Sequence, residues 1–181
     1  MSLAKLITAE LRRLGADAAA LAAIPADEAG LRTVELGGAD GTPSARVTFF
    51  DADRYSVSLR MLTVAGRELP PPGDEPGAAD ARLAALASGV IAGLSYLEEP
   101  LAVVERDAAD AQAQIRSHPP LREDELLSYW DVALTSGARP SASIARYCWE
   151  PGLPERQPLP YPATYALVAR IADSLVAALD I

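Results

Sequence analysis

The only cysteine of the chain, Cys148, lies in the stretch IARYCWEPG at residues 144–152, two residues after Arg146. A guanidinium group on the same face of a strand lowers the pKa of a thiol and so favours the nucleophilic thiolate. A cysteine nucleophile also needs a general base, and His118, followed by two prolines, is the only histidine. Because free cysteines most often act as small buried hydrophobic residues, we predict a structural role for Cys148.

Arginines in the middle of predicted strands offer a second kind of chemistry. Guanidinium groups bind carboxylate and phosphate groups through paired hydrogen bonds. If the strands share one sheet, the arginines opposite the apolar stripes line one surface. We predict a face that binds an anion or ligand through Arg46, Arg60, Arg116, Arg146, Tyr129 and Cys148. The alternative is ordinary cross-strand pairing on a solvated face, for example of Arg146 with Asp131.

Sequence motifs for cofactor or metal chemistry are missing. The chain has no glycine-rich dinucleotide or phosphate loop, no HExxH and no GxSxG. Its clustered carboxylates, namely Glu98 with Glu99, Asp107 with Asp110, and Glu123 to Glu125, fall in predicted turns and loops, where carboxylates are usually solvated. With one cysteine and one histidine, a cysteine/histidine metal site is implausible. We therefore predict neither a catalytic residue nor a metal site nor a cofactor.

The net charge of the chain limits the classes of partner that we expect it to bind. The net charge is −9 at pH 7. Nucleic acids and anionic membranes attract basic surfaces, so we predict that neither is a partner. An acidic surface instead steers basic partners towards the protein. The N-terminus meets arginines too early for a secretory signal, and no apolar run spans a bilayer, which predicts a cytoplasmic protein.

Helical spacing of apolar residues marks three long segments. They cover residues 3–14, residues 80–97 and a C-terminal stretch that starts with Pro162 near its first turn. A short helix at 17–24 follows the first one. In the second long segment, Gly89 and Gly93 are spaced to let another backbone pack closely.

Alternation of apolar and polar residues predicts seven strands. They lie at residues 33–36, 45–49, 55–61, 101–106, 112–117, 127–135 and 143–150. In the third, Met61 falls on the apolar face. In the last, Tyr147 and Trp149 form the better core face and leave Arg146 and Cys148 on the other.

The order of elements predicts an α+β fold. We expect an antiparallel sheet of about six to seven strands in two meanders, with the N-terminal, central and C-terminal helices packed on one face. The chain forms a single domain at residues 1–181, or two lobes at 1–69 and 78–181 joined by the proline-rich linker 70–77. The pattern leaves open whether the strands make one sheet or two.

The element order, the acidic charge and the C-terminal amphipathic helix resemble those of the small acidic dimeric chaperones of type III secretion systems. The resemblance covers element order and charge, and the present chain has a longer second half. We predict a non-enzymatic protein-binding or chaperone-like module whose partner is another protein or a second copy, as a homodimer. The alternative is a small-molecule binding protein or enzyme that holds an anionic ligand in an arginine-lined face or pocket.

Overall fold

The computed structural model describes residues 2–181 of the chain. Its α-helices are α1 (Leu3–Ala16), α2 (Ala18–Ala22), α3 (Ala78–Gly93) and α4 (Tyr165–Leu179). Its strands are β1 (Arg32–Gly37), β2 (Ser44–Ala52), β3 (Ser56–Ala65), β4 (Leu101–Asp107), β5 (Gln112–Ser117), β6 (Leu121–Glu123), β7 (Leu126–Thr135), β8 (Ser141–Trp149), β9 (Gln157–Pro158) and β10 (Tyr161–Thr164). The fold is therefore α+β.

All strands join one antiparallel sheet. The main order is β1-β2-β3-β8-β7-β5-β4, while β10 pairs with β3, β6 with β7 and β9 with β8. The sheet has ten strands, so the prediction of six to seven strands in two meanders is wrong in this detail. The missed strands, β6, β9 and β10, have two to four residues each, too few for alternation to show.

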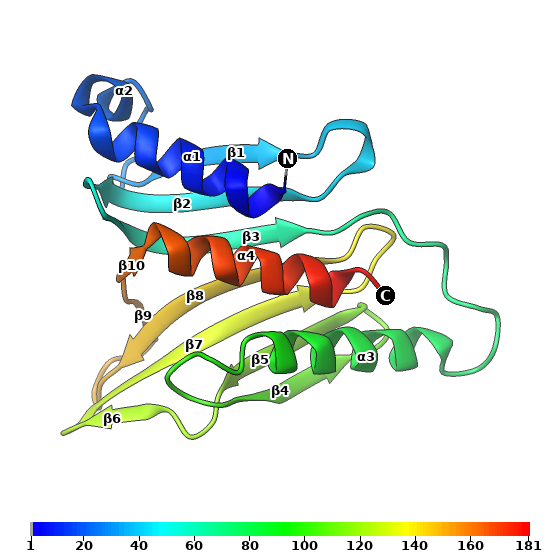
Figure 1. Ribbon diagram of the computed structural model, residues 1–181. Coiled ribbons are helices and arrows are strands. Elements are labelled where there is room, and N and C mark those ends of the chain that lie inside the picture. Colours follow the sequence, from blue (N-terminus) through cyan, green and yellow to red (C-terminus); the bar gives the residue numbers. More distant parts are fainter. Residues whose placement is uncertain (1) are drawn as a thin grey trace.

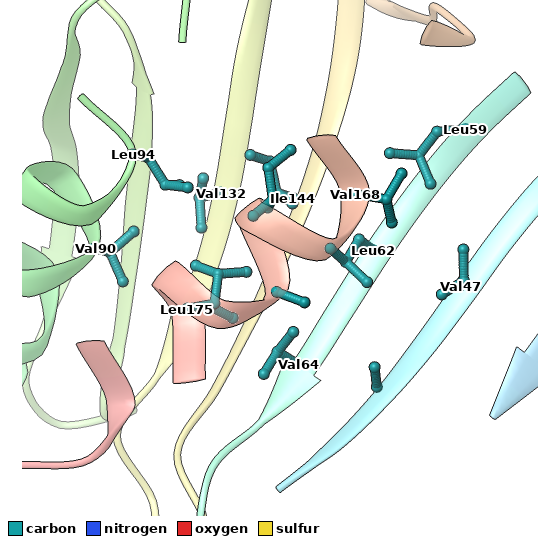
Figure 2. Packing of buried hydrophobic residues seen from close by; sticks show 14 of the residues in the cluster. Val47, Leu59, Leu62, Val64, Val90, Leu94, Val132, Ile144, Val168 and Leu175 are labelled. Carbon is teal, nitrogen blue, oxygen red and sulfur yellow. The ribbon is translucent and has the colours of Figure 1, made fainter. Parts of the chain in front are cut away.

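The three long helices lie side by side on one face of the sheet, with α4 between α1 and α3 (Figure 1). We call this the helix-covered face and the opposite one the outer face. Apolar residues of α4, such as Val168 and Leu175, point towards Leu62 and Ile144 of the central strands (Figure 2). The core thus lies between the sheet and the three helices. No helix of residues 2–181 is long and apolar enough to cross a membrane.

An irregularity in β3 changes which of its residues face the core. Thr48 pairs with Met61 and Phe49 with Leu59, so Arg60 is the extra residue of a β-bulge. Leu59 and Leu62 are both buried, whereas Met61 is only half-buried. The predicted strict alternation through Met61 is therefore wrong, because the bulge shifts the pattern by one residue.

The C-terminal helix starts later than predicted. Pro162 belongs to β10, where it lies opposite Ser58 of β3, and not to the first turn of a helix. The helix begins at Tyr165, and the side chain of Thr164 accepts a hydrogen bond from the Leu167 amide at 3.2 Å. Threonine is a good N-cap because its oxygen satisfies an amide that has no partner inside the helix.

Two glycines of α3 let it approach α4. A Cβ atom built on Gly89 would lie 3.4 Å from Ala178, and one on Gly93 would lie 3.3 Å from the carbonyl oxygen of Ser174. The predicted close packing at these glycines is confirmed.

This contact predicts opposite effects for two substitutions of Gly89. Gly89→Ala places its methyl group at the limit of ordinary contact and gains helix propensity, so we expect no loss of stability. Gly89→Leu has no room beside Ala178 and should lower the free energy of unfolding by about 1–3 kcal/mol. Urea unfolding of both variants measures the difference. Equal stability of the two would contradict the tight α3–α4 contact.

Candidate functional site

The register of β8 separates the predicted arginines onto two faces. Directly opposed residues of antiparallel strands share a face, and Arg146 lies opposite Trp130. Trp130 is part of the core, so Arg146 lies on the helix-covered face, as does Cys148, which pairs with Ser128. The expectation that Arg146 joins the other three arginines on one surface is wrong. Tyr147 pairs with Tyr129 on the outer face, so the expectation that Tyr147 and Trp149 face the core is wrong as well.

Arg146 can lie in the core because a carboxylate meets it there. Its guanidinium group donates to Glu99 at 2.7 Å and 3.1 Å and to the hydroxyl of Ser128 at 3.1 Å. Arg146 is 6% exposed and Glu99 is 7% exposed. A prediction from hydropathy alone places Arg146 on the outer face, because burying a charge costs the free energy of its hydration. The burial is possible here because the carboxylate of Glu99 compensates for that loss.

A second carboxylate holds the aromatic side chains around Arg146. The guanidinium carbon lies 5.2 Å from the ring centre of Trp130 and 5.8 Å from that of Tyr161. The indole N–H of Trp130 donates to Glu98 at 3.1 Å, and the Tyr161 hydroxyl donates to the same carboxylate. Burial and this hydrogen bond raise the pKa of Tyr161 to about 12. The cluster connects the segment before β4 to strands β7, β8 and β10, and its polar groups satisfy one another, which is the arrangement of a structural cluster.

On the outer face, arginine and tyrosine side chains gather over β3, β5, β7 and β8. We call this group the arginine–tyrosine face; it consists of Arg60, Arg116, Tyr129, Asp131, Tyr147 and Arg156. The guanidinium carbons of Arg60 and Arg156 lie 5.0 Å and 4.0 Å from the ring centre of Tyr147. That of Arg116 lies 5.0 Å from the ring of Tyr129. Such distances allow cation–π attraction, which orders the long side chains.

The carboxylate of Asp131 forms ion pairs with two of these arginines. Asp131 accepts from Arg116 at 3.0 Å and from Arg156 at 2.7 Å, while its side chain is only 6% exposed. Burial lowers the pKa of Arg156, but the charge of Asp131 and its hydrogen bond outweigh this effect, so the pKa lies above its ordinary value. The alternative of cross-strand pairing is confirmed for Arg116, which lies directly opposite Asp131, and for Arg46, which lies opposite Glu35. Its example, Arg146 with Asp131, is wrong because the two lie on opposite faces.

Arg60 is the unmatched cation of the arginine–tyrosine face. Its Nη2 atom donates to the Tyr147 hydroxyl at 3.3 Å, and its Nη1 atom is buried without a hydrogen-bond partner among residues 2–181. Two guanidinium groups thus share the carboxylate of Asp131, while the third, of Arg60, contacts only Tyr147; the three cations and one carboxylate leave this group with an excess of positive charge in an acidic protein. Buried donors without partners are rare and mark places where a ligand can supply the acceptor.

Arg46 does not belong to this group. It lies on the outer face but pairs with Glu35 of β1 at 2.6 Å, and both side chains are more than half exposed. Arg156 does belong to it and was missed, because it lies in the proline-rich segment between β8 and β9, where no alternation assigns a face. No group of three or more histidine, cysteine or acidic side chains in the described part of the chain is placed to hold a metal ion.

Comparison with known proteins gives no match. Neither a protein-family model, nor a curated protein, nor a solved structure matches this chain. No similar protein therefore indicates a role for the arginine–tyrosine face.

The buried ion pair predicts a strong effect of removing one charge. Glu99→Ala leaves Arg146 buried without its counter-charge, and we expect the free energy of unfolding to fall by about 3–5 kcal/mol. The double variant Glu99→Leu with Arg146→Met removes both charges and should recover most of this loss. Glu35→Ala, at the exposed pair, is the control and should cost less than about 1 kcal/mol. Urea unfolding measures all three, and a Glu99→Ala cost as small as that of the control would contradict the assignment.

The raised pKa of Tyr161 predicts a pH-dependent contribution to stability. The folded-state pKa of about 12 lies above the ordinary value of 10.0, so the contribution of neutral Tyr161 is complete below about pH 10. It is lost as the pH rises towards 12. Tyr161→Phe should cost roughly 1 kcal/mol at pH 8, and its difference from wild type should shrink between pH 10 and pH 11.5. Tyr55→Phe at an exposed position is the control, and urea unfolding at each pH is the measurement. A difference that stays constant with pH would refute this role.

Proposed function

We propose that the protein is a non-enzymatic protein-binding module that binds an acidic segment of a partner protein at the arginine–tyrosine face. The observation that carries the proposal is the unmatched guanidinium group of Arg60, which lies against Tyr147 beside Arg156, while Asp131 is already shared by Arg116 and Arg156. Arginine and tyrosine are the residues that most often dominate binding energy at protein interfaces. The long helices lie on the other side of the sheet, so they do not cover this face (Figure 1).

The charges favour a carboxylate-bearing partner over a neutral one. Arg116 and Arg156 already share Asp131, and Arg60 retains a buried N–H without an acceptor. A carboxylate placed beside Arg60 would satisfy this donor and neutralise part of the local positive charge. The half-buried ring of Tyr147 supplies apolar surface beside such a contact, and the buried ring of Tyr129, whose centre is 6.4 Å away, supports it from within the sheet.

A small anion is the second candidate. The unpartnered Nη1 atom of Arg60 is buried, and a phosphate or a small carboxylic acid is small enough to approach such a donor. The two candidates share their chemistry and differ in size, so the same experiment separates them. If the ligand is a small anion, the protein is a small-molecule binding protein or an enzyme that acts on an anionic substrate.

Binding of a labelled acidic peptide tests the proposal. We expect a twelve-residue glutamate-rich peptide to raise its fluorescence anisotropy with the protein, and a lysine-rich peptide of equal length to show no change. Arg60→Met should weaken binding about tenfold, which corresponds to about 1.4 kcal/mol. Arg12→Met, on the exposed side of α1, is the matched control. Inorganic phosphate and citrate, followed by thermal shift, form the small-anion arm.

The outcomes of this experiment are distinct. Peptide binding that Arg60→Met weakens supports the protein-binding module. Stabilisation by citrate or phosphate without peptide binding favours the small-molecule alternative. Absence of binding in every arm, with a folded protein, would overturn both. Light scattering on the same samples tests the further proposal that the module is a homodimer.

A further inference from the structure

Strand β4 forms one edge of the sheet. Within residues 2–181 it pairs with β5 alone, so the backbone amides and carbonyls along its other side have no strand partner. The segment from Val103 to Asp107 is exposed throughout. An open strand edge is a template for an extended segment of another chain, which adds to the sheet through main-chain hydrogen bonds.

Two adjacent valines make this edge apolar at its centre. Val103 is 42% exposed and Val104 is 48% exposed. The register shifts between Val103 and Glu105, so Val104 is the extra residue of a bulge. Val103 pairs with the core residue Ile115 and therefore lies on the helix-covered side. A strand added to β4 would remove this apolar surface from water, which favours binding.

The charges of the edge differ between its two sides. On the outer side, Glu105 and Asp107 lie opposite Gln114 and Gln112 of β5. Together with Asp110 they line a hollow of about 220 Å³. On the helix-covered side, Arg106 is already neutralised by Asp80 of α3 at 3.0 Å. The edge is thus acidic on the outer side and close to neutral on the other.

A second copy of the chain does not fit this edge. If two β4 strands paired about a two-fold axis between Glu105 and Asp107, these two residues would face the same carboxylates of the other copy. Like charges that lie opposite or diagonal to each other across a strand pair are destabilising. The edge is therefore protected against self-association and open to a strand of opposite charge.

We propose that β4 binds, by strand addition, an extended segment of a partner protein in which basic and apolar residues alternate. The basic side chains lie over Glu105, Asp107 and Asp110, and the apolar side chains lie beside Val103 on the helix-covered side. Because successive side chains of a strand point to opposite faces, one alternating segment places its basic side chains on the outer side and its apolar side chains on the helix-covered side. The net charge of −9 steers such a segment towards the protein. This site shares no residue with the arginine–tyrosine face.

An eight-residue fluorescent peptide of alternating lysine and valine tests the proposal. We expect it to bind in an anisotropy titration and to slow hydrogen exchange of the amides between Val103 and Asp107. A peptide with four lysines followed by four valines has the same composition without the alternation, and should bind at least tenfold more weakly. An alternating glutamate and valine peptide should not bind.

Charge reversal provides the matched variant. Glu105→Lys with Asp110→Lys should weaken binding of the lysine–valine peptide at least tenfold and create binding of the glutamate–valine peptide. Asp107 stays unchanged because its side chain closes the turn by accepting from the amides of Ala109 and Asp110. The control with equal charge change is Glu28→Lys with Glu125→Lys, outside β4 and β5.

Three results would overturn the proposal. They are equal binding of the alternating and block peptides, binding without protection of the β4 amides, and an equal effect of the control variant. Arg60→Met should leave this binding unchanged, so failure here and failure of the proposed function are read separately.

Discussion

The pairing of β3 with β8 is the constraint on which the rest of the structure depends. Four residue pairs, from Leu62 opposite Ile144 to Ala65 opposite Ser141, join the first three strands to the rest of the main sheet. On the outer face, the hydroxyl groups of Thr63 and Ser143 lie 2.8 Å apart across the same joint. Without this joint, Arg60 of β3 and Tyr147 of β8 would not meet, and the arginine–tyrosine face would not form.

The structure separates arginines that hold the fold together from an arginine that is free to bind. Arg146 has its charge matched by Glu99, donates a further hydrogen bond to Ser128 and is buried in the core. Arg60 has no carboxylate partner and keeps a buried donor unused. The same residue type therefore stabilises the protein on one face of the sheet and leaves an unmatched charge on the other.

The sequence was sufficient for the fold class and the main strands, because their alternation extends over enough residues to show. Prediction from the sequence failed where contacts between residues far apart in the chain decide on which face of the sheet a side chain lies. Nothing local indicates that Glu99 neutralises Arg146, so an arginine beside tyrosine and tryptophan was placed on the solvent side. The bulge at Arg60 shifted the alternation of β3 in the same unforeseen way. Arg156 reaches Asp131 from a proline-rich connection that has no period at all.

The position of α4 over the joint has a consequence for synthesis of the protein. Val168 and Leu175 of this helix cover apolar side chains of both halves of the sheet (Figure 2), yet they belong to a helix that follows all ten strands in the sequence. Until α4 has emerged, Leu62 and Ile144 lack the surface that buries them. The centre of the helix-covered face therefore stays exposed to water until α4 packs on it. Partly folded chains with such exposed apolar surface are prone to aggregate, which is the stage at which a chaperone would help most.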